Sequence, residues 1–225
     1  MRIDIATLFP QMCEIVLGES IIGKAISKNV VEVITHNIRD YAEGRYRRVD
    51  DYVYGGGFGM LLQAEPVYRC IQALKDSFRG EDVVIYMSPK GTRLTQKKVL
   101  ELAEVTHLII LAGHYEGVDQ RVLDLVVDEE ISIGDYVLTG GELPALVLVD
   151  AILRCVSGVL PSEKCYLEES HNNNVLECAQ YTRPKIWRGF EVPAELLSGN
   201  PKKINKWKRE SSLKITQEKR PDLLK

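Results

Sequence analysis

Three segments of the sequence combine glycine with polar or aromatic side chains in a way that suits ligand binding. They are Ser88-Pro89-Lys90-Gly91, Gly113-His114-Tyr115-Glu116-Gly117, and Ile133 to Pro144 (IGDYVLTGGELP). Glycine lets a ligand approach the backbone closely, and Glu116 can accept hydrogen bonds from a ribose or hold a cation. Taken singly, the GHYEG segment equally fits an ordinary strand-to-helix turn. Together the three segments predict a backbone-lined pocket for a small planar ligand, which would also cover the apolar Tyr-Val-Leu run of the third.

Another glycine-rich stretch, Gly55-Gly56-Gly57-Phe58-Gly59, lies in an irregular segment that spans residues 40–63. It has neither the G-x-G-x-x-G spacing of a dinucleotide site nor the Lys-Ser/Thr of a P-loop, which disfavours nucleotide triphosphate chemistry. Two interpretations remain: a mobile loop, or a flap that touches a ligand or RNA through its arginines, Arg45, Arg47 and Arg48.

The histidines and cysteines exclude several classes of enzyme. The four histidines have no nucleophile at a recognised local signature, so acyl-transfer hydrolysis is disfavoured. His36 and His107 fall in apparent strands, where we expect hydrogen-bonded structural roles, and only His114 lies in a loop of interest. The five cysteines form no C-x-x-C pair, which disfavours a zinc site and indicates a reducing compartment.

Arg154 is a further candidate for chemistry because it stands in a very apolar helix predicted over residues 144–156. A charge in such surroundings needs compensation. Asp150, one turn earlier, would provide it in an intramolecular ion pair, and an electron-rich ligand is the alternative.

An α/β sheet must position these candidates. Short apolar runs predict strands at residues 3–9, 31–38, 83–88 and 107–113, with a further strand near residue 130. Apolar residues at i, i+3 and i+4 predict helices at residues 11–17, 65–74, 95–103 and 119–126. This alternation predicts a mostly parallel sheet, and the glycine-rich segments would meet at its carboxyl edge.

Length and composition are those of an ordinary folded protein of one or two domains: 225 residues, 45% hydrophobic, with a net charge of -3. The charge is unevenly spread, since residues 1–160 hold 16 Lys/Arg and 23 Asp/Glu, whereas residues 161–225 hold 13 and 9. Residues 200–225 alone hold nine Lys/Arg and three Asp/Glu. Such an excess attracts polyphosphates, although a solvated helix face accounts for it equally well.

Polar sequence with three consecutive asparagines separates the acidic and basic parts. We therefore predict one domain over residues 1–159, a flexible linker over residues 160–175 and a small helical domain over residues 176–225. Ser198-Gly199-Asn200-Pro201 predicts the start of a basic helix in the last of these. The N-terminus has no secretion signal and no stretch reaches 18 apolar residues, so we expect a cytoplasmic protein without a membrane span.

At these residues the chain resembles the TrmD family of bacterial tRNA (guanine-N1)-methyltransferases, which modify the guanine 3′ to the anticodon (G37 of the tRNA). The resemblance covers nearly all of the chain. The motifs that carry it are DD-x-x-YGGG-x-GM from Asp50 to Met60, GHYEG from Gly113, SIGDYVLTGGELPA from Ser132, YTRP from Tyr181, and the basic segment from Leu197 through Trp207.

The resemblance implies a fold of the SPOUT class, with a parallel sheet, a deep trefoil knot and a small helical C-terminal domain. It also implies S-adenosylmethionine as methyl donor, bound in the knot by the first domain, and an anticodon stem-loop of tRNA bound by the last. Family members use magnesium, for which Glu116 is the candidate ligand if it does not contact the ribose. They form homodimers whose active sites lie between the subunits.

The residues that the resemblance places around the cofactor lie in the loops Met87–Lys90, Gly113–Gly117 and Ile133–Pro144. They are Met87, Ser88, Pro89, Gly113, Tyr115, Glu116, Gly117, Ile133, Gly134, Tyr136, Leu138, Gly140, Gly141 and Pro144.

The catalytic pair implied by the resemblance is a carboxylate base, Glu169, and Arg154. Guanine N1 carries a proton, so an enzyme must remove it and stabilise the negative charge that moves onto O6. The chain departs from the family pattern, with Glu instead of Asp at 169, His171 instead of an aromatic residue, Gln180 instead of His, and Phe58 instead of Pro. Two alternatives therefore stay open: a SPOUT methyltransferase acting on another RNA, and a catalytically weakened RNA-binding paralogue.

Overall fold

The computed structural model describes residues 1–162, 166, 169–171 and 174–224, which fall into two compact units, Met1–Ser162 and Glu163–Lys225. They are named unit 1 and unit 2. Within the predicted linker, residues 163–165, 167–168 and 172–173 lie outside the described residues.

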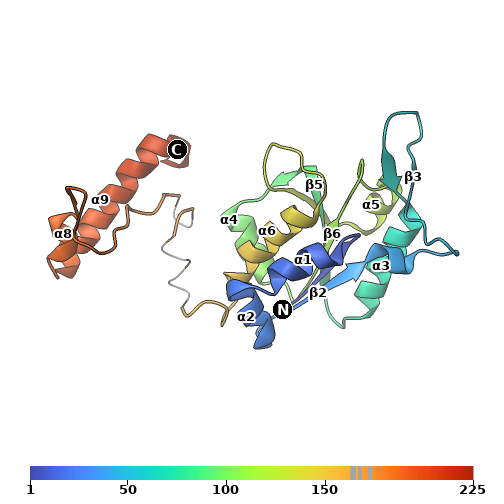
Figure 1. Ribbon diagram of the computed structural model, residues 1–225, viewed down its shortest axis with the longest axis horizontal. Helices are drawn as coiled ribbons and strands as arrows, with labels where there is room; N and C mark the ends of the chain where they lie inside the picture. Colours follow the sequence, from blue (N-terminus) through green and yellow to red (C-terminus); the bar gives the residue numbers. More distant parts are fainter. Residues whose placement is uncertain (163–165, 167–168, 172–173, 225) are drawn as a thin grey trace. The chain divides into compact units, whose positions relative to one another are not determined.

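Five strands form the central sheet of unit 1, counted over its described residues, and every pairing between them is parallel (Figure 1). The order is β2-β1-β6-β5-β7, with β1 Arg2–Thr7, β2 Glu32–Asn37, β5 Asp82–Arg93, β6 His107–Ala112 and β7 Glu129–Ser132. Arg2 and Asp82 both pair with His107, so β1, β5 and β6 start in line and their carboxyl ends lie at one edge. The predicted mainly parallel α/β sheet is confirmed.

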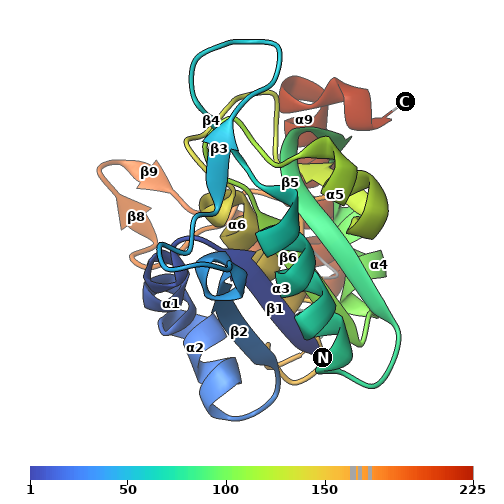
Figure 2. The same ribbon diagram turned by 90° about the vertical axis from the view of Figure 1, so that its right-hand side faces the viewer.

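Helices cover both faces of this sheet, as Figures 1 and 2 show. One face packs against α1 (Pro10–Leu17), α2 (Ser20–Ser27), α4 (Gln96–Ala103) and α6 (Glu142–Leu153), and the other against α3 (Ala64–Asp76) and α5 (Gln120–Val126). The alternation of β6 assigns its side chains to the two cores. Leu108 and Ile110 enter the first core, whereas Ile109 and Leu111 enter the second.

Several expected boundaries differ from the structure. Strand β5 continues to Arg93, beyond the predicted end at residue 88, because Thr92 and Arg93 pair with β7 after a shift in register. Helix α6 begins at Glu142 and ends at Leu153, so Arg154 is its C-cap rather than an interior residue. The irregular segment 40–63 contains an antiparallel hairpin formed by β3 (Asp50–Tyr52) and β4 (Met60–Leu62), preceded by the 3-10 turn η1 (Ile38–Tyr41).

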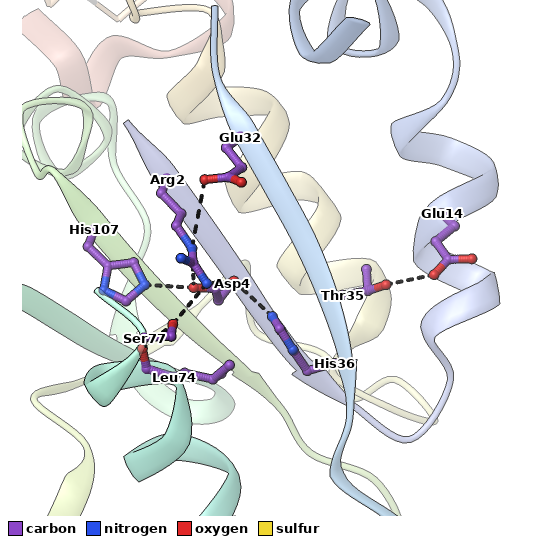
Figure 3. Close-up of polar contacts among 9 residues, drawn as sticks. All are labelled: Arg2, Asp4, Glu14, Glu32, Thr35, His36, Leu74, Ser77 and His107. Atoms are coloured by element: carbon purple, nitrogen blue, oxygen red, sulfur yellow. Dashed lines mark hydrogen bonds and ion pairs between the residues drawn. The ribbon is translucent and has the colours of Figure 1, made fainter. Parts of the chain in front are cut away.

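A buried carboxylate, Asp4, joins the three neighbouring strands β1, β2 and β6 (Figure 3). His36 Nε2 lies 2.8 Å from Asp4 Oδ1, and His107 Nε2 lies 2.7 Å from Asp4 Oδ2. The Nε atom of Arg2 is 2.8 Å from Oδ2. The expected structural roles of His36 and His107 are confirmed, since both bind the same carboxylate.

The hydrogen bonds around Asp4 determine its charge. Burial by itself raises the pKa of this carboxyl, but the bonds from His36, His107 and Arg2 outweigh it and hold the pKa below the ordinary 3.8. A carboxyl whose pKa is lower in the folded state stabilises the fold above its unfolded pKa. That contribution is lost as the pH falls through the folded pKa.

Unit 2 is organised along α9 (Pro201–Lys219), with α8 (Ala194–Leu197) and the hairpin of β8 (Ile186–Trp187) and β9 (Phe190–Glu191) before it, and η2 (Pro221–Leu224) after it. The side chain of Asn200 accepts hydrogen bonds from the N–H groups of Lys202 and Lys203, so the predicted helix start is confirmed. Within the described residues, no helix of either unit is long and apolar enough to cross a membrane.

We expect Asp4→Asn to lower the free energy of unfolding by about 3–5 kcal/mol at pH 7, because it leaves a buried cationic and polar cluster without its carboxylate. Urea unfolding followed by circular dichroism at one protein concentration measures this loss. The difference from wild type should narrow as the pH falls below 3.8, where the Asp4 contribution disappears. The control is Asp40→Asn, which removes an exposed ion pair with Arg47 and should leave the midpoint nearly unchanged. An equal midpoint for Asp4→Asn and wild type would contradict the role of Asp4.

Candidate active site

A pocket of about 410 Å³ lies at the carboxyl edge of the sheet in unit 1. Its walls are residues 86–90, 113–118, 130–134 and 136–141, completed by Leu61, Gln120, Leu123 and Pro144. This volume is typical of sites for small organic ligands, and the carboxyl edge is where open parallel sheets bind them.

The pocket segment Gly113–Gly117 follows β6 directly and is held from outside by the β3–β4 hairpin. Glu116 N donates to Met60 O at 3.0 Å, and Leu62 N donates to Gly117 O at 3.0 Å. The hairpin and the pocket loop are therefore hydrogen-bonded to each other.

The chain that returns from β7 toward α6 meets β6 at backbone distance. Gly141 N donates to Gly113 O at 2.7 Å, and His114 forms an isolated antiparallel bridge with Gly140. A Cβ atom on Gly141 would lie 2.8 Å from both Ala112 Cα and Gly113 N, which is closer than real side chains come. The crossing therefore requires glycine at position 141.

A buried carboxylate, Glu142, lies beneath this crossing at the first position of α6. It is 2% exposed, and the free N–H groups at a helix start favour a negative charge there. Thr7 Oγ1 donates to Glu142 Oε1 at 2.8 Å, while His114 Nδ1 lies 3.8 Å from Glu142 Oε2. The His114 ring also packs against Phe9, at 4.8 Å between centroids. Glu142, at the start of α6, thus contacts both the end of β1 and the pocket segment Gly113–Gly117.

The hydroxyl of Tyr86 contributes a neutral polar group to the pocket wall. Burial, with the charge of Glu130 adding to it, raises the pKa of Tyr86 to about 12. At neutral pH this phenol stays protonated and can donate a hydrogen bond to a ligand.

The apolar part of the third pocket segment is open, as expected for residues that a ligand would cover. Tyr136 is 56% exposed, Val137 80% and Leu138 40%. All three line the pocket, so a planar ligand bound there would remove their apolar surface from water.

The structure brings all fourteen residues proposed as cofactor contacts into this one pocket. Its wall contains Met87, Ser88, Pro89, Gly113, Tyr115, Glu116, Gly117, Ile133, Gly134, Tyr136, Leu138, Gly140, Gly141 and Pro144. Their role in binding stays a prediction.

The wall also contains residues outside the three predicted segments, among them Tyr86 and Glu130. Both lie inside strands, where the apolar pattern hides a residue that faces a pocket.

The predicted catalytic pair is divided between the two units. Arg154 follows α6 in unit 1 and is half-buried, and Glu169 is half-buried in unit 2. Neither is among the described residues that line the pocket. Glu168, the neighbour of Glu169 in the family motif, lies outside the described residues.

A metal site is not preformed in the part of the chain that the structure describes, because no group of three or more His, Cys, Asp or Glu side chains could hold an ion there. Glu116 lies in the pocket wall as a single carboxylate.

Comparison with known proteins identifies the family of the chain. The family model described as tRNA (Guanine-1)-methyltransferase TrmD matches residues 1–225. Curated relatives named tRNA (guanine-N(1)-)-methyltransferase include one from Ruminiclostridium cellulolyticum, 50% identical over 99% of this chain and 96% of its own length. Relatives from Alkaliphilus metalliredigens and Alkaliphilus oremlandii are 49% and 48% identical over 100% of this chain and 92% of theirs. The chain belongs to the TrmD family.

Proposed function

We propose that this chain transfers a methyl group from S-adenosylmethionine to N1 of the guanine 3′ to the anticodon of tRNA. The observation that carries the proposal is the pocket at the carboxyl edge of unit 1, where the three glycine-rich segments of a TrmD family member meet.

The pocket residues fit S-adenosylmethionine, which supplies a methyl group on a positively charged sulfur when bound. Backbone groups of the third pocket segment suit the edge of an adenine, and the apolar Tyr136 and Leu138 suit its faces. Glu116 suits the ribose hydroxyls, because a carboxylate accepts two hydrogen bonds. Magnesium stays a prediction of the resemblance, with Glu116 as the candidate ligand.

The knot of the SPOUT class is part of the proposal and is supported by the pairing of β5 with β7. Strand β7 pairs first with residues 85–87 and then with residues 92–93, so residues 88–91 form a bulge in the ladder opposite Ile131. Leu94 N also donates to Ser132 O at 2.8 Å. The chain that follows β7 returns to β6, where Gly141 N donates to Gly113 O at 2.7 Å, so segments far apart in the sequence cross here, as a knotted course would require.

A homodimer is supported by an exposed apolar surface on α1, α2 and α6. Its large side chains are Phe9, Met12, Ile15, Val16, Ile21, Leu143 and Val147, with Ile15 exposed by 72%. These helices contact one another, and grooves run between them. An apolar surface of this kind favours a protein partner, and we propose a second copy of the chain.

The proposed chemistry assigns Glu169 and Arg154 to the two charges that develop on guanine. Glu169 removes the N1 proton, which makes the nitrogen nucleophilic. Arg154 stabilises the negative charge on O6. Glutamate is one methylene longer than the family's aspartate, and a misplacement of about 1 Å can cost about 100-fold in rate. For this reason methylation of another RNA and a weakened RNA-binding paralogue are the alternatives that the experiments must separate.

RNA binding is assigned to unit 2, in accord with the domains proposed at residues 1–159 and 176–225 and the linker at 160–175. The exposed lysines of α9 include Lys202, Lys203, Lys206 and Lys208, which suit the phosphates of an anticodon stem. The reducing cytoplasm is the proposed site of action, because the five cysteines form no C-x-x-C pair and are odd in number.

Methyl transfer tests the function directly. Purified protein with labelled S-adenosylmethionine should methylate a tRNA transcript with G at the position 3′ to the anticodon, and not the same transcript with A there. Because N1 methylation blocks base pairing, reverse transcription should stop at that position. Incorporation into a different RNA alone would favour the first alternative, and cofactor binding without incorporation the second.

Glu169→Gln should lower turnover by about 100-fold or more, because it removes the base and little volume. Isothermal titration should show nearly unchanged affinity for S-adenosylmethionine. Glu169→Asp keeps a carboxylate and should retain far more activity. The matched control is Glu177→Gln, an exposed glutamate that accepts a hydrogen bond from Gln180, and its turnover should match wild type. Wild-type turnover in Glu169→Gln would remove the assignment.

Gly141→Ala should weaken the binding of S-adenosylmethionine by about 5- to 100-fold, because the added Cβ forces the two pocket loops apart. Titration calorimetry measures the change. Gly18→Ala is the control, since its Cβ would be 3.4 Å from Glu14 O, an ordinary contact, and its φ of -76° is helical. Equal affinities in the two variants would show that the loop crossing does not form the binding site.

A further inference from the structure

The β8–β9 hairpin of unit 2 exposes large apolar side chains, two of them aromatic, that have no part in the proposed catalysis. Trp187 is 59% exposed, Phe190 75% and Ile186 53%. Exposed aromatic groups on a short hairpin are costly in water unless a partner covers them. The hairpin is therefore a candidate contact surface.

The hairpin geometry puts its two aromatic rings together. Trp187 pairs directly with Phe190 across the strands, so both side chains lie on one face. Arg188 and Gly189 form the two-residue connection with φ values of +51° and +84°, as a tight type I′ turn requires. Val192 N donates to Lys185 O at 3.0 Å and closes the hairpin below.

A cation, Arg188, lies beside the Trp187 ring. The guanidinium carbon of Arg188 lies 5.1 Å from the centroid of the Trp187 ring, which is a cation–π contact. Because Trp187 stays more than half exposed beside Arg188, a flat ligand can still reach its ring. Trp187, Arg188 and Phe190 form what we name the hairpin platform.

The chain leading to the platform is attached to α9. Ala179 N donates to Ser211 Oγ at 3.2 Å, and the ring of Tyr181 meets that of Trp207 at 6.0 Å between centroids. The platform is thus tied to the helix whose lysines are proposed to contact phosphates.

The charge around the platform indicates the chemistry of its ligand. Residues 181–190, YTRPKIWRGF, contain three exposed cations, Arg183, Lys185 and Arg188, and no acidic residue. Aromatic rings interleaved with cations are the pattern that binds unpaired nucleic acid, where bases stack on the rings and cations meet the phosphates. Paired RNA hides its base faces, so such a surface selects unpaired nucleotides.

We infer that the hairpin platform stacks on unpaired bases of the RNA substrate, separately from the phosphate contacts of α9. This inference rests on the proposed function, because it assumes an RNA substrate. It adds to the proposed function a surface that binds unpaired nucleotides and that a fully paired stem cannot occupy.

The test compares Trp187→Leu with wild type in the full-length chain, because leucine keeps an apolar side chain and removes the flat ring. Fluorescence anisotropy at one salt concentration measures binding to a tRNA transcript and to a fully paired RNA duplex. We expect tRNA binding to weaken by about 5- to 100-fold and duplex binding to change less than about twofold. Trp187→Phe, which restores an aromatic ring, should recover tRNA binding.

The matched control is Lys208→Ala on α9. It should weaken the binding of tRNA and of duplex alike and reduce the salt dependence of both, as loss of a phosphate contact does. Equal losses on tRNA and duplex for Trp187→Leu would overturn the platform, as would no loss on either. A shift of Trp187→Leu toward monomer in analytical ultracentrifugation would also overturn it and assign the hairpin to a contact with a second copy.

A second measurement does not depend on how well the leucine variant folds. Trp207→Phe leaves Trp187 as the single tryptophan, since the chain has two. A single-stranded RNA of the anticodon loop sequence should quench its fluorescence, and the paired duplex should not. Equal quenching by both would refute stacking. If wild-type protein methylates tRNA but the Trp187 variants bind tRNA as it does, the platform is refuted and the proposed function stands. If wild-type protein does not bind tRNA, the proposed function and the platform both fail.

Discussion

The hydrogen bond from Gly141 N to Gly113 O, 2.7 Å long, joins the two chain segments on which the candidate site depends. One segment has just left β6, and the other has returned from β7 at the far edge of the sheet. Their backbones come so close that only glycine fits at position 141. The pocket walls, the start of α6 and the proposed threading all follow from this crossing.

The two ends of the sheet in unit 1 have opposite properties. Toward the amino ends, Asp4 binds Arg2, His36 and His107 across three strands and leaves a closed, internally satisfied carboxylate. At the carboxyl ends, glycine-rich segments leave backbone groups and the Tyr136 to Leu138 run open to a ligand. Buried hydrogen bonds thus stabilise the end with Asp4. The open pocket at the other end stabilises the fold only when a ligand binds there.

The separation of charge along the chain follows the separation into units. The first part of the chain has an acidic excess, whereas the last part, with α9 and the hairpin before it, has a basic excess. An acidic protein can therefore attract a polyanion locally, because salt at physiological concentration screens the field of an exposed charge beyond about 8 Å. In unit 2, α9 has exposed cations, which suit phosphates, and the hairpin platform has flat rings, which suit bases.

Local patterns in the sequence were sufficient for the elements whose stability comes from neighbouring residues. Apolar runs predicted β1, β5 and β6, and the Asn200-Pro201 signal predicted the start of α9. The glycine-rich segments after the strands predicted a shared pocket, because the carboxyl ends of parallel strands share an edge, and the resemblance named fourteen residues that line it. The resemblance to a family, carried by motifs along the whole chain, supplied the chemistry that composition alone left open.

Contacts between residues far apart in the chain were decided only by the tertiary structure. The sequence does not indicate that Glu142 is buried against Thr7 and His114, or that β4 holds the loop at Glu116, since these pairs depend on how distant segments pack. Strand β5 runs through Pro89 and Gly91 because β7 pairs with it again beyond them, which overrides the local tendency of those residues to end a strand. Residue types and spacing thus determined which groups are available for chemistry, and packing decided which of them share a site, because burial and close backbone approach are properties of the whole fold.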